Sequence, residues 1–177
     1  KSKKNVVDPE AIIERYGADT ARWFMLSATP PERDIEGTES GVEGAWRFTQ
    51  RLWRLVNDAA REGAPGEPEG ATGAALDLRR TAHRALEAVT GDLMNLRFNR
   101  SIARVYELAN AVGAALQSAD RSEPMRRSLR EAAEIMVLMA APMMPHLAEE
   151  CWKELGHLIP VVDTPWPKAD AALVADD

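Results

Sequence analysis

The feature that most constrains the fold is a series of apolar residues at helical spacing, interrupted repeatedly by proline or glycine. Apolar residues that recur every three or four positions indicate amphipathic helices. They predict helices over about residues 9–16, 20–29, 43–61, 74–93, 97–118, 123–141 and 145–155. No long stretch alternates apolar and polar residues as a strand would, and no internal repeat is found. The chain is therefore predicted to be an all-α bundle of four or five main helices, preceded by a smaller N-terminal helical piece.

Local signals mark the ends of several predicted helices. Asp8 followed by Pro9 is typical of a helix start, and Gly17 is typical of a helix stop. Asp19 is expected to cap the second helix. Residues 63–73, GAPGEPEGATG, are rich in glycine and proline and predict a flexible, exposed connection between two helices.

Composition excludes several classes of protein. The chain has 177 residues, of which 45% are hydrophobic and 28% charged, as is ordinary for a soluble globular protein. No apolar run reaches the roughly 18 residues of a membrane span, so no membrane partner is expected. A single cysteine, Cys151, rules out an internal disulfide framework and fits a cytoplasmic protein. The net charge of −6 requires that positive charge for any nucleic acid partner be gathered on one surface.

Arginine is gathered on two of the predicted helices. Each helix carries a row of three arginines that falls within an arc of about 60°, with apolar residues on the opposite side. The rows have spacings of i, i+4, i+7 and of i, i+3, i+7, and they consist of Arg47, Arg51 and Arg54, and of Arg97, Arg100 and Arg104. Shorter i, i+4 pairs are formed by Arg80 with Arg84 and by Arg126 with Arg130.

Two interpretations of these rows remain open from spacing alone. The planar guanidinium group matches the oxygens of a phosphate, so the rows could lie along an RNA backbone. Alternatively, each row is the solvated face of an amphipathic helix, paired with nearby glutamates.

Other candidate sites are weaker. His146 and Glu149 share one face of the last short helix, but one cysteine and three histidines do not provide a zinc site at usual spacing, and no metal is expected. This segment is interpreted as a helix start. Glu149 and Glu150 are expected to be solvated, and Cys151 and Trp152 are expected to be packed. The five tryptophans are interpreted as core residues rather than a stacking platform. No catalytic triad, phosphate loop or dinucleotide fingerprint is found.

Several short segments are similar to a known family. Lys1 and Ser2 match the last two letters of a KMSKS signature, which residues 3–9 continue. YGADT at 16–20, PPERD at 30–34 and GVEGAWRF at 41–48 add to the match, as do FN at 98–99, PHLAEE at 145–150 and PWP at 165–167. Through these segments the chain resembles the leucyl-tRNA synthetases, class I aminoacyl-tRNA synthetases of bacterial type. Gly37 stands where that family usually has tryptophan.

The resemblance implies three parts. Residues 1–40 are a KMSKS-loop remnant with a helical connecting segment, residues 41–160 are the anticodon-binding helical bundle, and residues 161–177 are a tail that leads towards an absent C-terminal domain. It implies that Lys1 is the catalytic lysine that neutralises the triphosphate in the parent enzyme, and that Ser2 shares the ATP site.

The resemblance also implies the partners. These are tRNA(Leu), bound through the six arginines of the two rows, and the catalytic and editing domains of the same chain. ATP with magnesium is the implied cofactor of the parent enzyme, which attaches leucine to tRNA. No HIGH motif is found, so this chain by itself is expected to bind the tRNA backbone without a cofactor and without catalysis.

Two alternatives compete with this interpretation. The net charge of −6 favours a free-standing helical adaptor that binds proteins, whereas the broken signature at Lys1 argues against it. The equivalent bundle of a valine-type or isoleucine-type synthetase is the other alternative, and the segment 41–55 favours the leucine type.

Overall fold

The computed structural model describes residues 8–28 and 39–175, and within these residues it contains helices and no strand. The all-α prediction is therefore confirmed. The helices, in chain order, are α1 (Pro9–Tyr16), α2 (Ala18–Ala28), α3 (Glu39–Glu62), α4 (Gly73–Met94), α5 (Phe98–Gln117), α6 (Glu123–Ala140), α7 (Pro145–Glu154), the 3-10 helix η1 (Val161–Asp163) and α8 (Ala171–Val174).

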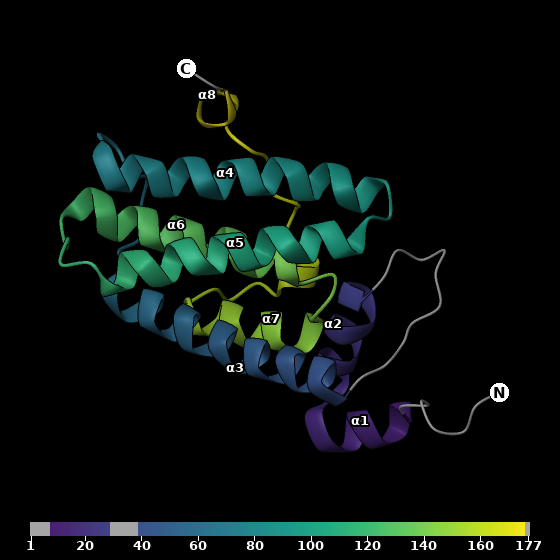
Figure 1. Ribbon diagram of the computed structural model, residues 1–177. Helices are drawn as coiled ribbons and strands as arrows, with labels where there is room; N and C mark the ends of the chain where they lie inside the picture. Colours follow the sequence, from purple (N-terminus) through teal and green to yellow (C-terminus); the bar gives the residue numbers. More distant parts are fainter. Residues whose placement is uncertain (1–7, 29–38, 176–177) are drawn as a thin grey trace.

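The four long helices form a bundle in which α3 and α5 run in one direction and α4 and α6 run in the other (Figure 1). α4 lies on one side, α3 on the opposite side, and α5 and α6 lie between them. The two short N-terminal helices lie at the end where α3 begins, and α7 lies beside α3. The shared core is made mainly of alanine, leucine, valine and methionine side chains from all of these helices except η1 and α8.

An aromatic cluster attaches α2 to the bundle. The ring of Trp23 stacks on that of Phe48, with 5.0 Å between centroids, and Phe48 lies 4.2 Å from the ring of Tyr106. The indole N–H of Trp23 donates a hydrogen bond of 3.1 Å to the hydroxyl of Tyr106. Because Trp23 is fully buried, its N–H needs this partner, and the cluster fixes α2 against both α3 and α5.

The first helix begins and ends as predicted. The carboxylate of Asp8 accepts a hydrogen bond from the backbone N–H of Glu10, and Pro9 occupies the first turn. Gly17 ends α1 with a φ of 86°, a conformation that residues with a Cβ rarely adopt.

The prediction for Asp19 was wrong. Asp19 lies inside α2 rather than before it, and its carboxylate accepts hydrogen bonds from the backbone N–H groups of His146 and Leu147, at 3.4 and 2.6 Å. These two residues lie in the first turn of α7, whose own N-cap residue, Met144, makes no side-chain cap. Asp19 therefore caps a helix that lies more than a hundred residues further along the chain.

The segment 63–73 is attached to α6 at two points, and most of its residues are exposed, as predicted. The N–H of Ala64 donates to the carbonyl of Arg126 at 3.0 Å, and the guanidinium of Arg127 donates to the carbonyl of Glu67 at 3.1 Å. A Cβ at Gly63 would lie 2.5 Å from the carbonyl oxygen of Ala59. Glycine is therefore required where the chain leaves α3 and turns along α6.

The C-terminal segment is also held against the bundle. The carboxylate of Glu149 accepts hydrogen bonds from the N–H groups of Val161 and Val162, at 2.9 and 3.0 Å, at the start of η1. Further along, the indole N–H of Trp166 donates to the hydroxyl of Thr90 on α4 at 3.0 Å. Glu149 is thus engaged by backbone groups, and the prediction that it is solvated was wrong.

Candidate nucleic-acid interface

Helix α3 buries its apolar side and turns its arginines outward. Its buried residues are Val42, Ala45, Phe48, Thr49, Leu52, Leu55, Val56 and Ala59. Arg47 and Arg54 are exposed and Arg51 is half-buried, so the predicted row lies along one edge of the outer surface of the helix. Arg97, directly before α5, and Arg100 and Arg104 on α5 are likewise exposed.

The two arginine rows lie on neighbouring helices that run in parallel. Phe48 of α3 contacts Tyr106 of α5, and the guanidinium of Arg51 donates a hydrogen bond of 2.9 Å to the side-chain oxygen of Asn110. The two helices therefore run side by side in the same direction, as Figure 1 also shows. Arg47 lies one residue before Phe48, and Arg104 lies two residues before Tyr106, so these two arginines lie at the same level of the pair.

Half of the six arginines lack a partner in the described part of the chain. The guanidinium groups of Arg54, Arg97 and Arg100 make no hydrogen bond or ion pair with residues 8–28 or 39–175. Among the described residues, the guanidinium of Arg51 binds only the neutral amide of Asn110.

The other two arginines pair with glutamates of their own helices. Arg47 lies 3.9 Å from Glu43, and Arg104 lies 3.1 Å from Glu107. Exposed pairs of this kind contribute about 0.3–0.5 kcal/mol each, so they can exchange for a phosphate at little cost. The interpretation as solvated faces paired with glutamate thus describes Arg47 and Arg104 and not the other four.

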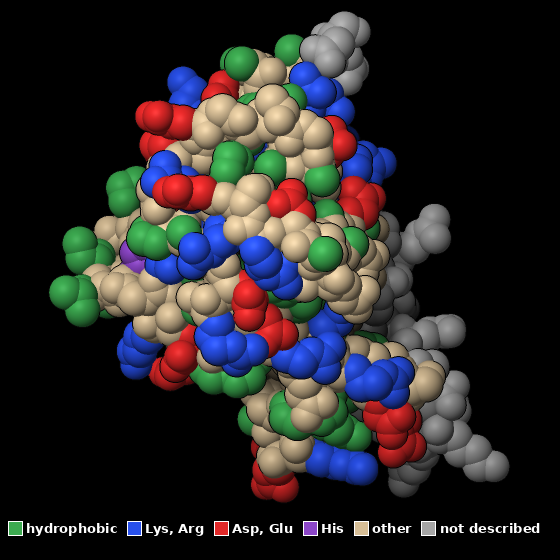
Figure 2. Space-filling view, turned by 90° about the vertical axis from the view of Figure 1, so that its left-hand side faces the viewer, with side chains coloured by type: hydrophobic (Ala, Val, Ile, Leu, Met, Phe, Trp, Pro, Cys, Tyr) green, Lys and Arg blue, Asp and Glu red, His purple; other side chains and the backbone are tan. Residues whose placement is uncertain are grey.

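Other arginines have structural roles. Figure 2 shows Lys and Arg side chains mixed with acidic ones over the end of the bundle where α3 and α5 end and α4 and α6 begin. Near this end, Arg121 donates to the carbonyls of Leu116 and Ser118, and Arg126 donates to the carbonyl of Glu62. Guanidinium groups used in this way fix loops, and their charges are directed at backbone oxygens.

Arg84 and Arg130, from the two shorter arginine pairs, also donate to backbone carbonyls. Arg84 donates to the carbonyl of Ala175 at 3.0 Å. Arg130 pairs with Glu134 at 3.0 Å and also donates to the carbonyl of Leu155. Both arginines thereby attach C-terminal segments to the bundle, which distinguishes them from the rows on α3 and α5.

Two groups of predicted residues do not lie together in a site. Lys1 and Ser2, and also Gly37, fall outside the described residues. His146 and Glu149 diverge, since His146 Nδ1 binds Asp19 at 2.9 Å and Glu149 binds the start of η1. Within residues 8–28 and 39–175, no three His, Cys, Asp or Glu side chains are grouped so that they could hold a metal ion.

The tryptophans divide into two classes, and the expectation that all five are core residues was wrong. Trp23 and Trp152 are buried, whereas Trp46, Trp53 and Trp166 are 36, 38 and 39% exposed. Trp46 and Trp53 lie seven residues apart on α3, beside the arginine row. Their spacing, on the border of the apolar side of α3, was the available signal that they line a surface.

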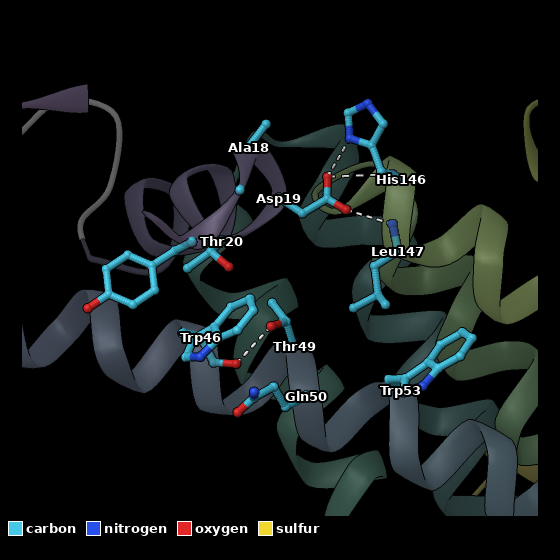
Figure 3. Close-up of a pocket in the computed structure, with 11 residues that line it drawn as sticks. Ala18, Asp19, Thr20, Trp46, Thr49, Gln50, Trp53, His146 and Leu147 are labelled. Atoms are coloured by element: carbon cyan, nitrogen blue, oxygen red, sulfur yellow. Dashed lines mark hydrogen bonds and ion pairs between the residues drawn. The ribbon is translucent and has the colours of Figure 1, made fainter. Parts of the chain in front are cut away.

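Trp46 and Trp53 line a cavity of about 370 Å³ between α2, α3 and α7. Figure 3 shows their indole rings rising from α3, with Gln50 between them and Leu147 of α7 facing Trp53. Thr20 of α2 forms part of the wall; its hydroxyl is buried and has no hydrogen-bond partner. The cavity is thus mostly apolar, with few polar groups.

A buried ionic cluster lies elsewhere, between α4 and α6. Glu131 binds Arg79 at 2.9 Å and also contacts Nε2 of His83, whose Nδ1 accepts the N–H of Asp170 at 3.0 Å. Burial acts to raise the pKa of Glu131, but the hydrogen bonds and positive charges of His83 and Arg79 outweigh it, and the pKa is lowered from its usual 4.5. Every member has a structural partner, which indicates a role in stability.

The chain is similar to proteins of known type. Residues 76–177 match the family described as the anticodon-binding domain of tRNA ligase, and residues 1–37 match the class I tRNA synthetases for I, L, M and V. Leucine–tRNA ligases of Parvibaculum lavamentivorans and Methylocella silvestris are 56% and 51% identical over the whole chain. The chain spans about a fifth of the length of these curated relatives, 20% and 21%.

Solved structures agree with the sequence relatives. A leucyl-tRNA synthetase (LeuRS) of Agrobacterium radiobacter, in a ternary complex with tRNA and LeuAMS, matches with a TM-score of 0.84 and 26% identity, over 99% of this chain and 23% of that one. A methionyl-tRNA synthetase of Mycobacterium tuberculosis shares the fold with a TM-score of 0.69 at 22% identity, over 98% of this chain and 38% of that one.

These findings confirm the resemblance and favour neither the adaptor nor a valine-type or isoleucine-type bundle. Among the described residues, no helix is both long and apolar enough to span a bilayer. The chain belongs to the family of anticodon-binding domains of tRNA ligases, and leucine–tRNA ligases match it along its whole length.

Proposed function

We propose that this chain is the tRNA-binding part of a leucine–tRNA ligase and that it holds the backbone of tRNA(Leu) through the arginine rows of α3 and α5. The parent enzyme joins leucine to tRNA using ATP and magnesium. In that enzyme Lys1 and Ser2 belong to the ATP-binding site. The catalytic and editing domains of the same chain are then its other partners. The relative of known structure, which contains tRNA, supports this proposal.

The proposed division of labour follows the same three parts. Residues 1–40 connect to the catalytic domain, residues 41–160 form the bundle that contacts tRNA, and residues 161–177 form the tail. A cytoplasmic location is part of the same proposal.

The observation that carries the proposal is the arrangement of the two rows. Parallel α3 and α5 place six arginines along one pair of neighbouring helices, and four of these have no acidic partner among the described residues. Guanidinium groups spaced along a helix pair suit a phosphate backbone, whose recognition depends on charge and shape rather than on base edges.

The test is a double charge reversal, Arg51→Glu with Arg54→Glu, in this chain. Binding to a tRNA(Leu) transcript is measured at several salt concentrations. Each lost phosphate contact lowers the slope of log K against log[salt] by roughly 0.7–0.9, so the variant should bind more weakly and with a flatter slope.

A matched control is Lys153→Glu with Lys168→Glu, which changes the net charge by the same amount away from the rows. Lys153 is exposed on α7, and its one ion pair within the described part of the chain is with Glu150 of its own helix, at 3.1 Å. The control should keep the slope of the wild type. Equal losses in the two double variants would show that bulk charge alone acts, and would contradict the assignment to the rows.

A further inference from the structure

The cavity beside the arginine row contains groups that the backbone-binding role leaves unused. Two indoles of α3, from Trp46 and Trp53, are more than a third exposed on its rim. The hydroxyl of Thr20 is fully buried and unpartnered at its wall. Leaving a buried hydroxyl without a partner costs stability, so such a group needs an explanation.

The composition of the cavity fits a flat ring with polar edges. Its walls are mostly carbon, from the two indoles and from Leu147. Between the indoles lies Gln50, whose side chain makes no hydrogen bond within the described residues. An amide and a hydroxyl can bind the donors and acceptors on the edge of a heterocycle, while indole faces stack on its plane.

The cavity lies directly beside the arginine row of α3, where a polyanion would bind. On α3 each cavity residue is followed directly by an arginine: Trp46 by Arg47, Gln50 by Arg51, and Trp53 by Arg54. Successive residues of a helix point about 100° apart, so α3 presents an aromatic row and an arginine row side by side. A chain that alternates phosphate and base could use both rows at once.

We infer that this cavity receives an unstacked nucleobase of the bound tRNA, with the neighbouring phosphates held by Arg47, Arg51 and Arg54. The inference rests on the proposed function, because it assigns a base site to the same bound RNA. The base stacks on Trp53 or Trp46, and its edge binds Gln50 and Thr20. With about 370 Å³, the cavity is near the lower end of the range for ligand pockets, roughly 300–1,000 Å³, which suits one nucleotide.

The side chain of His146 adds a polar group at the rim. Its Nδ1 binds the carboxylate of Asp19 at 2.9 Å, and the imidazole is largely exposed. Asp19 is the one acidic group among the described residues that line the cavity, and it is engaged by the first turn of α7. A bound nucleotide therefore meets a carboxylate that is already compensated.

The test compares Trp53→Ala with Trp53→Phe, using a tRNA(Leu) transcript and a fully paired RNA duplex of equal nucleotide number. Because stacking of a base on an aromatic side chain is lost, Trp53→Ala should lower the affinity for tRNA about tenfold. Trp53→Phe should keep most of the affinity. The salt slope should stay that of the wild type, because no phosphate contact is lost. Binding to the duplex, which offers no unstacked base, should be unchanged.

Trp166→Ala is the matched control, because Trp166 is as exposed as Trp53 and lies against Thr90 of α4, away from the cavity. It should leave tRNA binding unchanged. Thr20→Val is the second variant: it removes the unpartnered hydroxyl with nearly the same shape. It should weaken tRNA binding about threefold while leaving thermal stability equal or higher.

The outcomes separate the two proposals. If the charge reversal in the arginine row weakens binding but Trp53→Ala and Thr20→Val do not, the base site is wrong and the backbone role stands. An equal loss for Trp53→Ala on tRNA and on duplex also overturns the base site. If the wild type shows no salt-dependent binding to tRNA, both proposals fail.

Discussion

The carboxylate of Asp19 lies 2.6 Å from the backbone nitrogen of Leu147 and closes the first turn of α7 from outside (Figure 3). The contact joins α2 to a helix far along the chain. A helix start without a cap leaves N–H groups unsatisfied. The first turn of α7 therefore receives its cap from an acidic side chain of α2.

Replacing Asp19 by alanine should lower the free energy of unfolding by about 1–2 kcal/mol, the usual cost of losing an N-cap. Asp19→Asn, which keeps an acceptor oxygen, should lose less. Urea unfolding followed by circular dichroism measures both. Asp77→Ala is the control, since Asp77 is exposed on α4, and it should change stability by less than about 0.5 kcal/mol. Equal effects at the two positions would contradict the capping role.

Glu131 should make stability depend on pH in the acid range. Its folded pKa lies below the usual 4.5, so its stabilising contribution is present above about pH 4.5 and is lost as the pH falls through the folded pKa. Glu131→Gln should be less stable than wild type at pH 7 by about 1–3 kcal/mol, since hydrogen bonds to a charged group are replaced by neutral ones. Chemical unfolding between pH 7 and pH 3 should show the difference shrinking. A difference that stays constant over this range would be inconsistent with the cluster.

Cys151 should be inert in the folded protein. Burial, together with the charges of Glu154 and Glu150, raises the pKa of the thiol to about 12. At pH 8 the thiolate is then about one part in ten thousand, and the side chain is also inaccessible. Reaction with a chromogenic disulfide should be negligible without denaturant and complete in guanidinium chloride. Fast labelling of the native chain would show that the packing of α7 is not as described.

The chain alone should not activate leucine. No HIGH motif is found in the sequence, and the matched relatives are about five times longer, since the chain covers 20% of one and 21% of another. Incubation with leucine, ATP, magnesium and tRNA should give no pyrophosphate exchange. The full-length relative, assayed in parallel, supplies the positive control. Exchange above the blank by this chain would refute the expectation.

Signals carried by adjacent residues predicted the fold well. Proline in the first turn, a capping side chain and a terminal glycine set the bounds of α1. At the start of α6, Pro124 lies in the first turn and the hydroxyl of Ser122 accepts a hydrogen bond from the N–H of Met125. These devices act over a few bonds, so the sequence contains all that is needed to identify them.

Contacts between distant segments were the ones missed. The residue type and position of Asp19 suggest a cap for its own helix. Because α2 packs on α7, its carboxylate instead accepts a hydrogen bond from the N–H of Leu147. The glycine-rich segment after α3 has a flexible composition, yet Ala64 is bound by the carbonyl of Arg126.

The candidate interface was predicted in part. The arginine rows follow from helical spacing, but spacing does not distinguish Arg54, which lacks a partner among the described residues, from Arg126, which holds the carbonyl of Glu62. The exposure of Trp46 and Trp53 depends on how α2 and α7 leave a space above α3, and no local pattern encodes that space.

The uncompensated arginines have a kinetic consequence in a chain whose net charge is −6. A polyanion that approaches most faces of this molecule is repelled by its net negative charge. The arginines of α3 and α5 attract it locally. Long-range fields of this kind select the orientation of an encounter before any contact forms. Encounters through α3 and α5 should therefore lead to binding more often than encounters through other faces, which should be short-lived.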